Sequence, residues 1–144
     1  MKIKRINHLG IVPKDLNQSK NFFTLILGLN HEGGETVEEQ KVAVEFVRCE
    51  NSRLELLSPT SSDSPIAKFL ETKGSGIQHI ALEVDNLDIW IDHLKKNNIK
   101  LIDEKPRYGA HNMRIVFVHP HSTGGVLVEL VEEHLLEIDI ALLA

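Results

Sequence analysis

The amino-acid sequence predicts an α+β fold in which two tandem βαβββ modules form a strongly curved mixed sheet around a central cleft. Three observations lead to this prediction: two segments of the 144-residue chain begin alike, they end alike, and each carries a helix pattern followed by strand patterns. Such self-similarity is typical of a duplicated unit. We expect module one at about 3–58, a linker helix at about 64–73 and module two at about 76–132, within a single domain 1–132 that is followed by a tail at 133–144.

The two modules begin with matching strand-like segments. Residues 6–12 read Ile-Asn-His-Leu-Gly-Ile-Val, and residues 77–84 read Ile-Gln-His-Ile-Ala-Leu-Glu-Val. His79 therefore lies 71 residues after His8, at the same place in its module. Runs rich in branched apolar residues are typical of strands, so each module is expected to open with a strand that carries one histidine.

A helix is expected next in module one. Asp15 can cap its N-terminus, and Gly28 offers a stop at its C-terminus. Apolar residues recur near helical spacing between them. The aromatic and aliphatic side chains of this segment that we expect in the core are Phe22, Phe23 and Leu27.

Two further helices are expected, one between the modules and one within module two. Ser64 followed by Pro65 predicts the start of a short linker helix that ends near Gly74. Asp85 or Asn86 can cap the helix of module two, which runs into lysines and asparagines suited to a helix C-terminus. The apolar face of that helix consists of Leu87, Trp90, Ile91 and Leu94.

Strand patterns follow the helix of each module. They lie at 42–48 and 53–57 in module one, and at 115–119 and 126–131 in module two. Their branched and aromatic side chains suit a pleated sheet. The modules therefore have matching orders of elements, as a duplication requires.

The two modules also end alike, each with a glutamate between apolar residues. Leu54-Glu-Leu-Leu57 corresponds to Val128-Glu-Leu-Val131, and Glu129 lies 74 residues after Glu55. A buried carboxylate is costly unless it is paired or binds a metal. Strand alternation offers a second interpretation, in which both glutamates face water while their neighbours face the core.

Repetition favours a metal site over isolated polar residues. If the modules are related by pseudo-twofold symmetry, one histidine and one glutamate of each project into a shared cleft: His8, Glu55, His79 and Glu129. Two imidazoles and two carboxylates suit one divalent ion, and such ligands discriminate little between Co, Mn, Ni and Zn. A six-coordinate ion would keep two positions open for substrate oxygens.

Composition limits the classes of partner and compartment. The net charge of −5 gives no basic field for nucleic acid or an anionic membrane surface. No apolar run approaches the roughly 18 residues of a membrane span, and the start lacks a signal-peptide pattern. Cys49 is the only cysteine, so no internal disulfide can form. We therefore expect a cytoplasmic protein. We also expect a homodimer, and the apolar tail could either pack on the domain or cover a dimer surface.

Longer motifs narrow the class of protein. They are Asp63-Ser-Pro-Ile-Ala-Lys-Phe-Leu70, Gly76-Ile-Gln-His-Ile-Ala81, Gly109-Ala-His111 and Ser122-Thr-Gly-Gly-Val-Leu-Val-Glu-Leu130. With the paired histidines and glutamates, they resemble the methylmalonyl-CoA epimerases of the vicinal-oxygen-chelate superfamily, over about residues 6–132. Lys41 and Asn112 depart from the pattern, because the family usually has glycine at both positions.

The resemblance implies a glyoxalase-like fold, an acyl-CoA substrate and epimerisation through a metal-stabilised enolate. Epimerisation needs a base on one face of the substrate and a proton donor on the other. The resemblance assigns Glu129 as both ligand and acid/base, and Glu39 as the opposing group, although Glu38 fits after a one-residue shift. Gln78 and His111 are the expected substrate-binding residues.

Two other functions are consistent with the same modules. A glyoxalase I-like lyase or isomerase would use the metal on another thioester or on a hemithioacetal. A non-catalytic ligand-binding protein of the same fold would need no metal. The epimerase differs from both in predicting exchange of the substrate α-proton with solvent.

Overall fold

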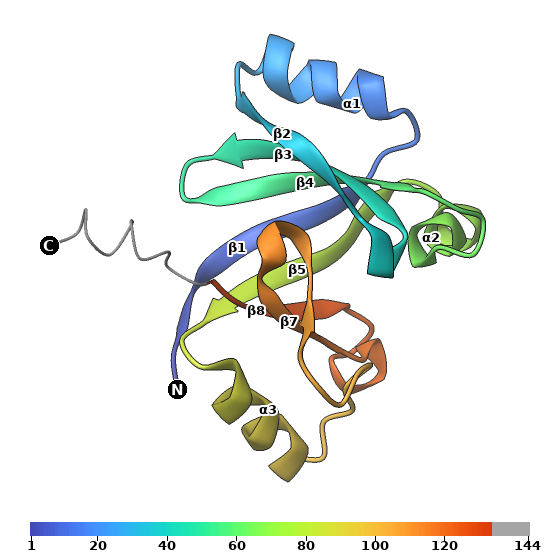
Figure 1. Ribbon diagram of the computed structural model, residues 1–144. Coiled ribbons are helices and arrows are strands. Elements are labelled where there is room, and N and C mark those ends of the chain that lie inside the picture. The colour runs from blue at the N-terminus through green and yellow to red at the C-terminus, as the bar shows by residue number, and fades with distance from the viewer. Residues whose placement is uncertain (134–144) are drawn as a thin grey trace, which may run out of the picture.

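In the computed structural model, which describes residues 1–133, one eight-stranded mixed sheet curls into a half-barrel (Figure 1). The strand order is β2-β3-β4-β1-β5-β8-β7-β6. Module one supplies the first four strands and module two the last four, which confirms the predicted α+β fold of two βαβββ modules. Residues 134–144 of the expected tail lie outside the described part of the chain.

Module one begins with a strand, continues through a helix and ends in three strands. Its elements are β1 (Ile3–Val12), α1 (Leu16–Asn21), a π-helical turn (Phe22–Ile26), β2 (Asn30–Val37), a 3-10 turn (Glu38–Gln40), β3 (Val42–Cys49) and β4 (Ser52–Pro59). Asp15 caps α1 as predicted, because its Oδ1 accepts a hydrogen bond from the backbone N–H of Gln18 at 3.0 Å.

Module two repeats this order after the linker helix. The elements are α2 (Pro65–Lys73), β5 (Gly76–Val84), α3 (Leu87–Lys96), β6 (Arg107–Tyr108), a 3-10 turn (Ala110–Asn112), β7 (Arg114–Val118), a second 3-10 turn (Pro120–Ser122) and β8 (Val128–Glu132). Ser64 caps α2 as predicted. Asn86 rather than Asp85 caps α3, through a 3.2 Å hydrogen bond from the backbone N–H of Ile89.

The modules join along β1 and β5, which pair antiparallel at the centre of the sheet. On either side, β4 runs parallel to β1 and β8 runs parallel to β5. The register sets Gly10 opposite His79 and Ala81 opposite Glu129. Because neighbouring strands lie about 4.8 Å apart, side chains from β4, β1, β5 and β8 on one face can meet.

Apolar side chains cover both faces of the sheet. On one face, α3 buries Leu87 and Ile91 against strands of module two, and each such side chain contributes about 1.5–3 kcal/mol of hydrophobic stabilisation. On the other face, Ile66 of α2 packs with Val44 and Leu57. Among the helices within residues 1–133, none is long and apolar enough to cross a membrane.

The prediction that Phe22 and Leu27 lie in the core is wrong. Their side chains are 48% and 54% exposed, and Phe23 is half-buried. The expected helix turns π-helical after Asn21, and the N–H of Leu27 bonds to the carbonyl of Phe22 five residues before it. A spacing of 3.6 residues no longer identifies the buried face where hydrogen bonds span five residues.

The two departures from family glycines fall at left-handed positions of the backbone. Lys41 has φ of 56° and Asn112 has φ of 54°. Glycine adopts this region without the steric cost that a side chain brings. The backbone therefore keeps the conformation that the resemblance implies, at a cost in strain.

Candidate metal centre and cavity

The four predicted ligands come from the four central strands of the sheet. His8 lies on β1, His79 on β5, Glu55 on β4 and Glu129 on β8. All four side chains are buried, and no residue exposure in this set exceeds 6%. The alternative in which the two glutamates face water is therefore wrong.

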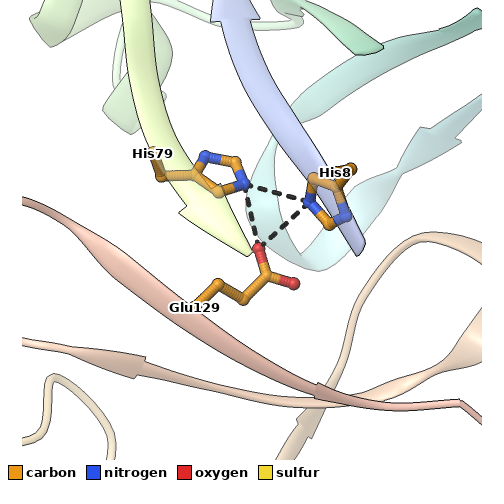
Figure 2. Close-up of side chains that lie close together, drawn as sticks. All are labelled: His8, His79 and Glu129. Atoms are coloured by element: carbon orange, nitrogen blue, oxygen red, sulfur yellow. Dashed lines mark hydrogen bonds and ion pairs between the residues drawn. The ribbon is translucent and has the colours of Figure 1, made fainter. Parts of the chain in front are cut away.

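Three of the four side chains converge on one point (Figure 2). The Nε2 atoms of His8 and His79 are 3.2 Å apart. One carboxylate oxygen of Glu129, Oε2, lies 3.0 Å from Nε2 of His79 and 3.5 Å from Nε2 of His8. The ligand atoms of these three residues lie within 4.8 Å of one another, so they could hold one metal ion.

The second ring nitrogen of each histidine faces the side-chain oxygen of the residue before it. Nδ1 of His8 lies 2.7 Å from Oδ1 of Asn7, and Nδ1 of His79 lies 2.6 Å from Oε1 of Gln78. An amide oxygen only accepts, so both Nδ1 atoms donate. In the neutral imidazoles, the lone pairs are then on the two Nε2 atoms that face each other.

This donor set fits a divalent cation. Two lone pairs at 3.2 Å cannot hydrogen-bond to each other, so a proton or a cation must lie between them. Two imidazole nitrogens and a carboxylate oxygen are ligands that zinc, cobalt and nickel accept. Hydrogen bonds that orient each imidazole from its other nitrogen are typical of metal-binding histidines.

Glu129 gives the group of His8, His79 and Glu129 a negative charge that suits a cation. Burial raises the pKa of the Glu129 carboxyl, but the imidazoles of His8 and His79 outweigh burial and bring it to about 2. Burial lowers the pKa of His8, but Glu129 and Glu55 outweigh burial and raise it. Glu129 is therefore ionised at neutral pH. A metal ion would compete with a proton for the lone pair on Nε2 of His8.

Glu55 lies outside the group of three. Its Oε2 is 3.2 Å from Nδ1 of His8, on the far side of the ring from Glu129, and 3.6 Å from Nε of Arg53. Within residues 1–133, that buried oxygen has no hydrogen-bond partner. A buried acceptor without a partner is costly, and a cation nearby would offset its charge.

Gly10 makes room for the ring of His79. A Cβ atom at Gly10 would lie 2.1 Å from Cε1 and 2.2 Å from Nδ1 of His79. No real side-chain contact is that short, so only glycine lets His79 lie across β1. The motif His8-Leu-Gly10 therefore supplies one candidate ligand and the space for a second, His79.

A cavity of about 420 Å³ opens onto this cluster. All four predicted ligands line it, together with the predicted residues Glu39 and Gln78. Apolar side chains form much of the rest of the lining: Val37, Val42, Val44, Leu57, Met113, Ile115, Phe117 and Leu127. A buried cluster of ligands at an apolar cavity is typical of a small-molecule site.

Comparison with known proteins agrees with this geometry. A family model described as the glyoxalase/bleomycin resistance protein/dioxygenase superfamily matches residues 7–117. The chain belongs to this superfamily. Membership of a superfamily gives the fold, and fold alone does not determine the reaction.

Several similar proteins within the superfamily are methylmalonyl-CoA epimerases. Methylmalonyl-CoA epimerase from Bos taurus is 42% identical over 129 residues, which cover 88% of this chain and 73% of that protein. A crystal structure of methylmalonyl-CoA epimerase from Mycobacterium tuberculosis is 32% identical with a TM-score of 0.88, over 92% of this chain and 90% of that chain. Another methylmalonyl-CoA epimerase, in complex with methylmalonyl-CoA and NH4⁺, has a TM-score of 0.85 at 32% identity, over 92% and 96% of the two chains. The predicted resemblance is confirmed, and these relatives are isomerases.

The remaining predicted site residues differ in whether they line the cavity. Glu39 lines the cavity, whereas Glu38 does not. Gln78 also lines it, and its Oε1 contacts His79. His111 is not among the lining residues, because its ring packs on Phe46 at 4.1 Å between centroids.

The sequence did not predict every polar residue of the site. Asn7 was not among the predicted site residues, although it precedes His8 as Gln78 precedes His79, with the same shift of 71. Gln40 and Arg107 line the cavity and were also not selected. The duplicated Asn/Gln-His pair was a usable signal for Asn7. Gln40 and Arg107 line the same cavity only because the sheet is curved.

Proposed function

We propose that this protein is a metal-dependent epimerase that interconverts the two epimers of methylmalonyl-CoA by removing and returning the α-proton. One observation carries the proposal: His8, His79 and Glu129 converge at a cavity of about 420 Å³. The chain that builds this cavity is similar over most of its length to methylmalonyl-CoA epimerases. That space accommodates the acyl end of such a thioester.

Glu129 is the proposed acid/base on one face of the substrate. His8, His79 and Glu129 would hold a divalent cation, whose positive charge would favour the enolate when the α-proton leaves. Oε2 of Glu129 faces both imidazoles, while its other carboxylate oxygen points away from them (Figure 2). One oxygen is therefore placed as a ligand, and the second is available to accept a proton.

Glu39 is the proposed acid/base on the opposite face. It belongs to the 3-10 turn between β2 and β3, so it enters the cavity lining from a different element than Glu129 on β8. Its side chain is 64% exposed, and its Oε1 lies 3.7 Å from Nε of Arg107. Contact with water lets this carboxyl exchange its proton with solvent between turnovers.

Replacing Glu39 with glutamine is expected to separate proton exchange from inversion. With Glu129 alone, one epimer should exchange its α-proton with solvent on one face, while inversion falls by roughly 10²–10⁴-fold because general acid–base groups contribute that much. Chiral chromatography and NMR in deuterated water measure the two rates. Glu38→Gln is the matched control, since Glu38 is not part of the lining. Equal inversion rates in both variants would rule out the role of Glu39.

Two buried donors in the cavity lining are suited to substrate oxygens. Among the described residues, Nε2 of Gln40 and Nε of Arg107 have no hydrogen-bond partner. Arg107 is held in place from its other end, where Nη1 donates to Asp103 at 2.9 Å. A buried donor without a partner is costly, so these groups are ready to bind an oxygen of the acyl-CoA. We place Gln78 beside them as a further substrate contact.

Gln40→Leu is expected to raise KM about tenfold, because it removes a hydrogen bond worth about 1–1.5 kcal/mol. The affinity for metal should not change, since Gln40 does not contact the cluster of His8, His79 and Glu129. Steady-state kinetics and metal titration measure the two effects. Gln18→Leu on the surface of α1 is the control for the same change of side chain. A KM equal to that of the wild type would exclude Gln40 from substrate binding.

The test of the activity itself uses one epimer of methylmalonyl-CoA in deuterated water. Metal-loaded protein should convert it into both epimers with deuterium at the α-carbon, and removal of the metal with a chelator should stop both processes. A glutathione hemithioacetal serves as the second substrate. Turnover of the hemithioacetal without α-proton exchange would replace the epimerase proposal with a glyoxalase-like one. Binding of acyl-CoA without either reaction would indicate a binding protein.

A further inference from the structure

Asn7 has a buried side-chain amide. Of the three candidate ligands His8, His79 and Glu129, it contacts His8. Its side chain is 1% exposed, and its Oδ1 lies 2.7 Å from Nδ1 of His8. We propose that Asn7 is a positioning residue that fixes which nitrogen of His8 is presented to the metal ion. This inference rests on the metal site proposed above and goes further, because it assigns a role to a residue outside the ligand set.

The orientation of the Asn7 amide follows from its other partners. Its Nδ2 donates to Oε1 of Glu83 at 2.9 Å. Its Oδ1 accepts from Nη2 of Arg53 at 3.4 Å. A carboxylate only accepts and a guanidinium only donates, so the amide cannot be reversed without losing both contacts.

Asn7 makes the hydrogen bond to Nδ1 of His8 in the described part of the chain; Oε2 of Glu55 lies 3.2 Å from the same nitrogen but forms no hydrogen bond. Because Oδ1 of Asn7 can only accept, Nδ1 of His8 must carry its proton. The lone pair of the neutral imidazole is therefore on Nε2, the atom that faces His79 and Glu129. A metal ion then meets a ring already in the required tautomer and orientation, which lowers the cost of binding.

Ion pairs on the far side of Asn7 hold Glu83 in place. Nε of Arg5 donates to Oε1 of Glu83 at 3.0 Å, and Nη2 of Arg5 lies 2.8 Å from Oε2 of Glu133. The chain of contacts therefore runs from the partly exposed Arg5 through Glu83 and Asn7 to His8. In module two, the described contacts of the Gln78 amide are limited to His79, so that side chain lacks an equivalent anchor.

Asn7→Leu keeps a similar volume but removes the acceptor. We expect the dissociation constant for Co²⁺ or Zn²⁺ to rise by roughly 10–100-fold, the range found when an outer partner of a ligating histidine is lost. Long-range ¹⁵N–¹H spectra of His8 should show the proton shared between both nitrogens, whereas the wild type should hold it on Nδ1. A purely structural role would lower thermal stability without changing this spectrum.

A second variant keeps the hydrogen bonds of position 7 while exchanging the chemical groups, and it gives up the bond from Nε of Arg5 to Oε1 of Glu83. In Asn7→Asp with Glu83→Gln, the carboxylate at position 7 accepts from His8 and the new amide at position 83 donates to it. We expect this double variant to restore the wild-type proton position and a dissociation constant within about threefold of the wild-type value, less than the loss expected for Asn7→Leu. A folded double variant that binds metal as weakly as Asn7→Leu would overturn the proposal.

The same measurements distinguish this inference from the proposed function. If the wild-type protein bound no divalent metal, the metal-dependent epimerase would fail. The position of the proton on His8 can still be compared in metal-free protein at alkaline pH, where the imidazole is neutral. A wild-type proton position in folded Asn7→Leu would overturn the role of Asn7, whatever the metal result.

Discussion

Replacing Gly10 with alanine is expected to eliminate the metal site while the sheet remains folded. The added Cβ would lie 2.1 Å from the ring of His79, so the imidazole must leave its position opposite β1. Overpacking of this kind costs about 1–3 kcal/mol. We expect metal affinity to fall by more than about a hundredfold, because the change displaces a ligand itself rather than its outer partner. Isothermal titration with Co²⁺ and circular dichroism measure affinity and fold.

A double variant tests the cause of that loss. In Gly10→Ala with His79→Ala, the ring that collides with the new methyl group is absent. The unfolding free energy of the metal-free double variant should recover relative to Gly10→Ala alone, which a double-mutant cycle measures as coupling between the two positions. Gly10→Ala protein that binds Co²⁺ as tightly as the wild type would contradict the predicted collision.

Duplication explains why the candidate ligands could be selected from the sequence. A single histidine or glutamate in a strand has many explanations, but His8 and His79 occupy equivalent places in two matching segments. Glu55 and Glu129 do the same at the other end of each module. Since equivalent strands of two modules meet at the β1–β5 junction, equivalent residues meet there too.

Features without a local sequence signal were not predicted. β2 had no expected residue range, because its sequence Asn-His-Glu-Gly-Gly-Glu-Thr-Val is polar and exposed along all but its last residue, Val37. A strand at the edge of a sheet need not alternate between apolar and polar residues. Gln40 and Arg107 come from opposite ends of the sheet, and only its curvature brings both to one cavity.

Glu55 and Glu129 depart from the symmetry of the two modules, because they face different nitrogens of His8. Both are buried at equivalent places in the repeat, yet Glu129 faces Nε2 of His8 and Glu55 faces Nδ1. Arg53, two residues before Glu55, places a guanidinium 3.6 Å from the Glu55 carboxylate. The equivalent position in module two is Leu127, which carries no charge, and within residues 1–133 it is His8 and His79 that offset the burial of Glu129.

Replacing Glu129 with glutamine is expected to remove nearly all α-proton exchange, even when the metal site is saturated. Glutamine keeps the shape of the side chain, but it cannot accept the proton and carries no charge toward the cation. Loss of a general base lowers the rate by roughly 10²–10⁴-fold. Metal affinity should also fall, because one of three converging ligands becomes neutral.

Titrating the variant with metal separates the two effects of Glu129. Exchange of the α-proton is measured in deuterated water at increasing Co²⁺ until the bound metal matches that of the wild type. If Glu129 were only a ligand, exchange would return to the wild-type rate at saturation, and the base must then be sought elsewhere. If it is the base, exchange stays low at every metal concentration. The second carboxylate oxygen, which points away from both imidazoles in Figure 2, supports this result.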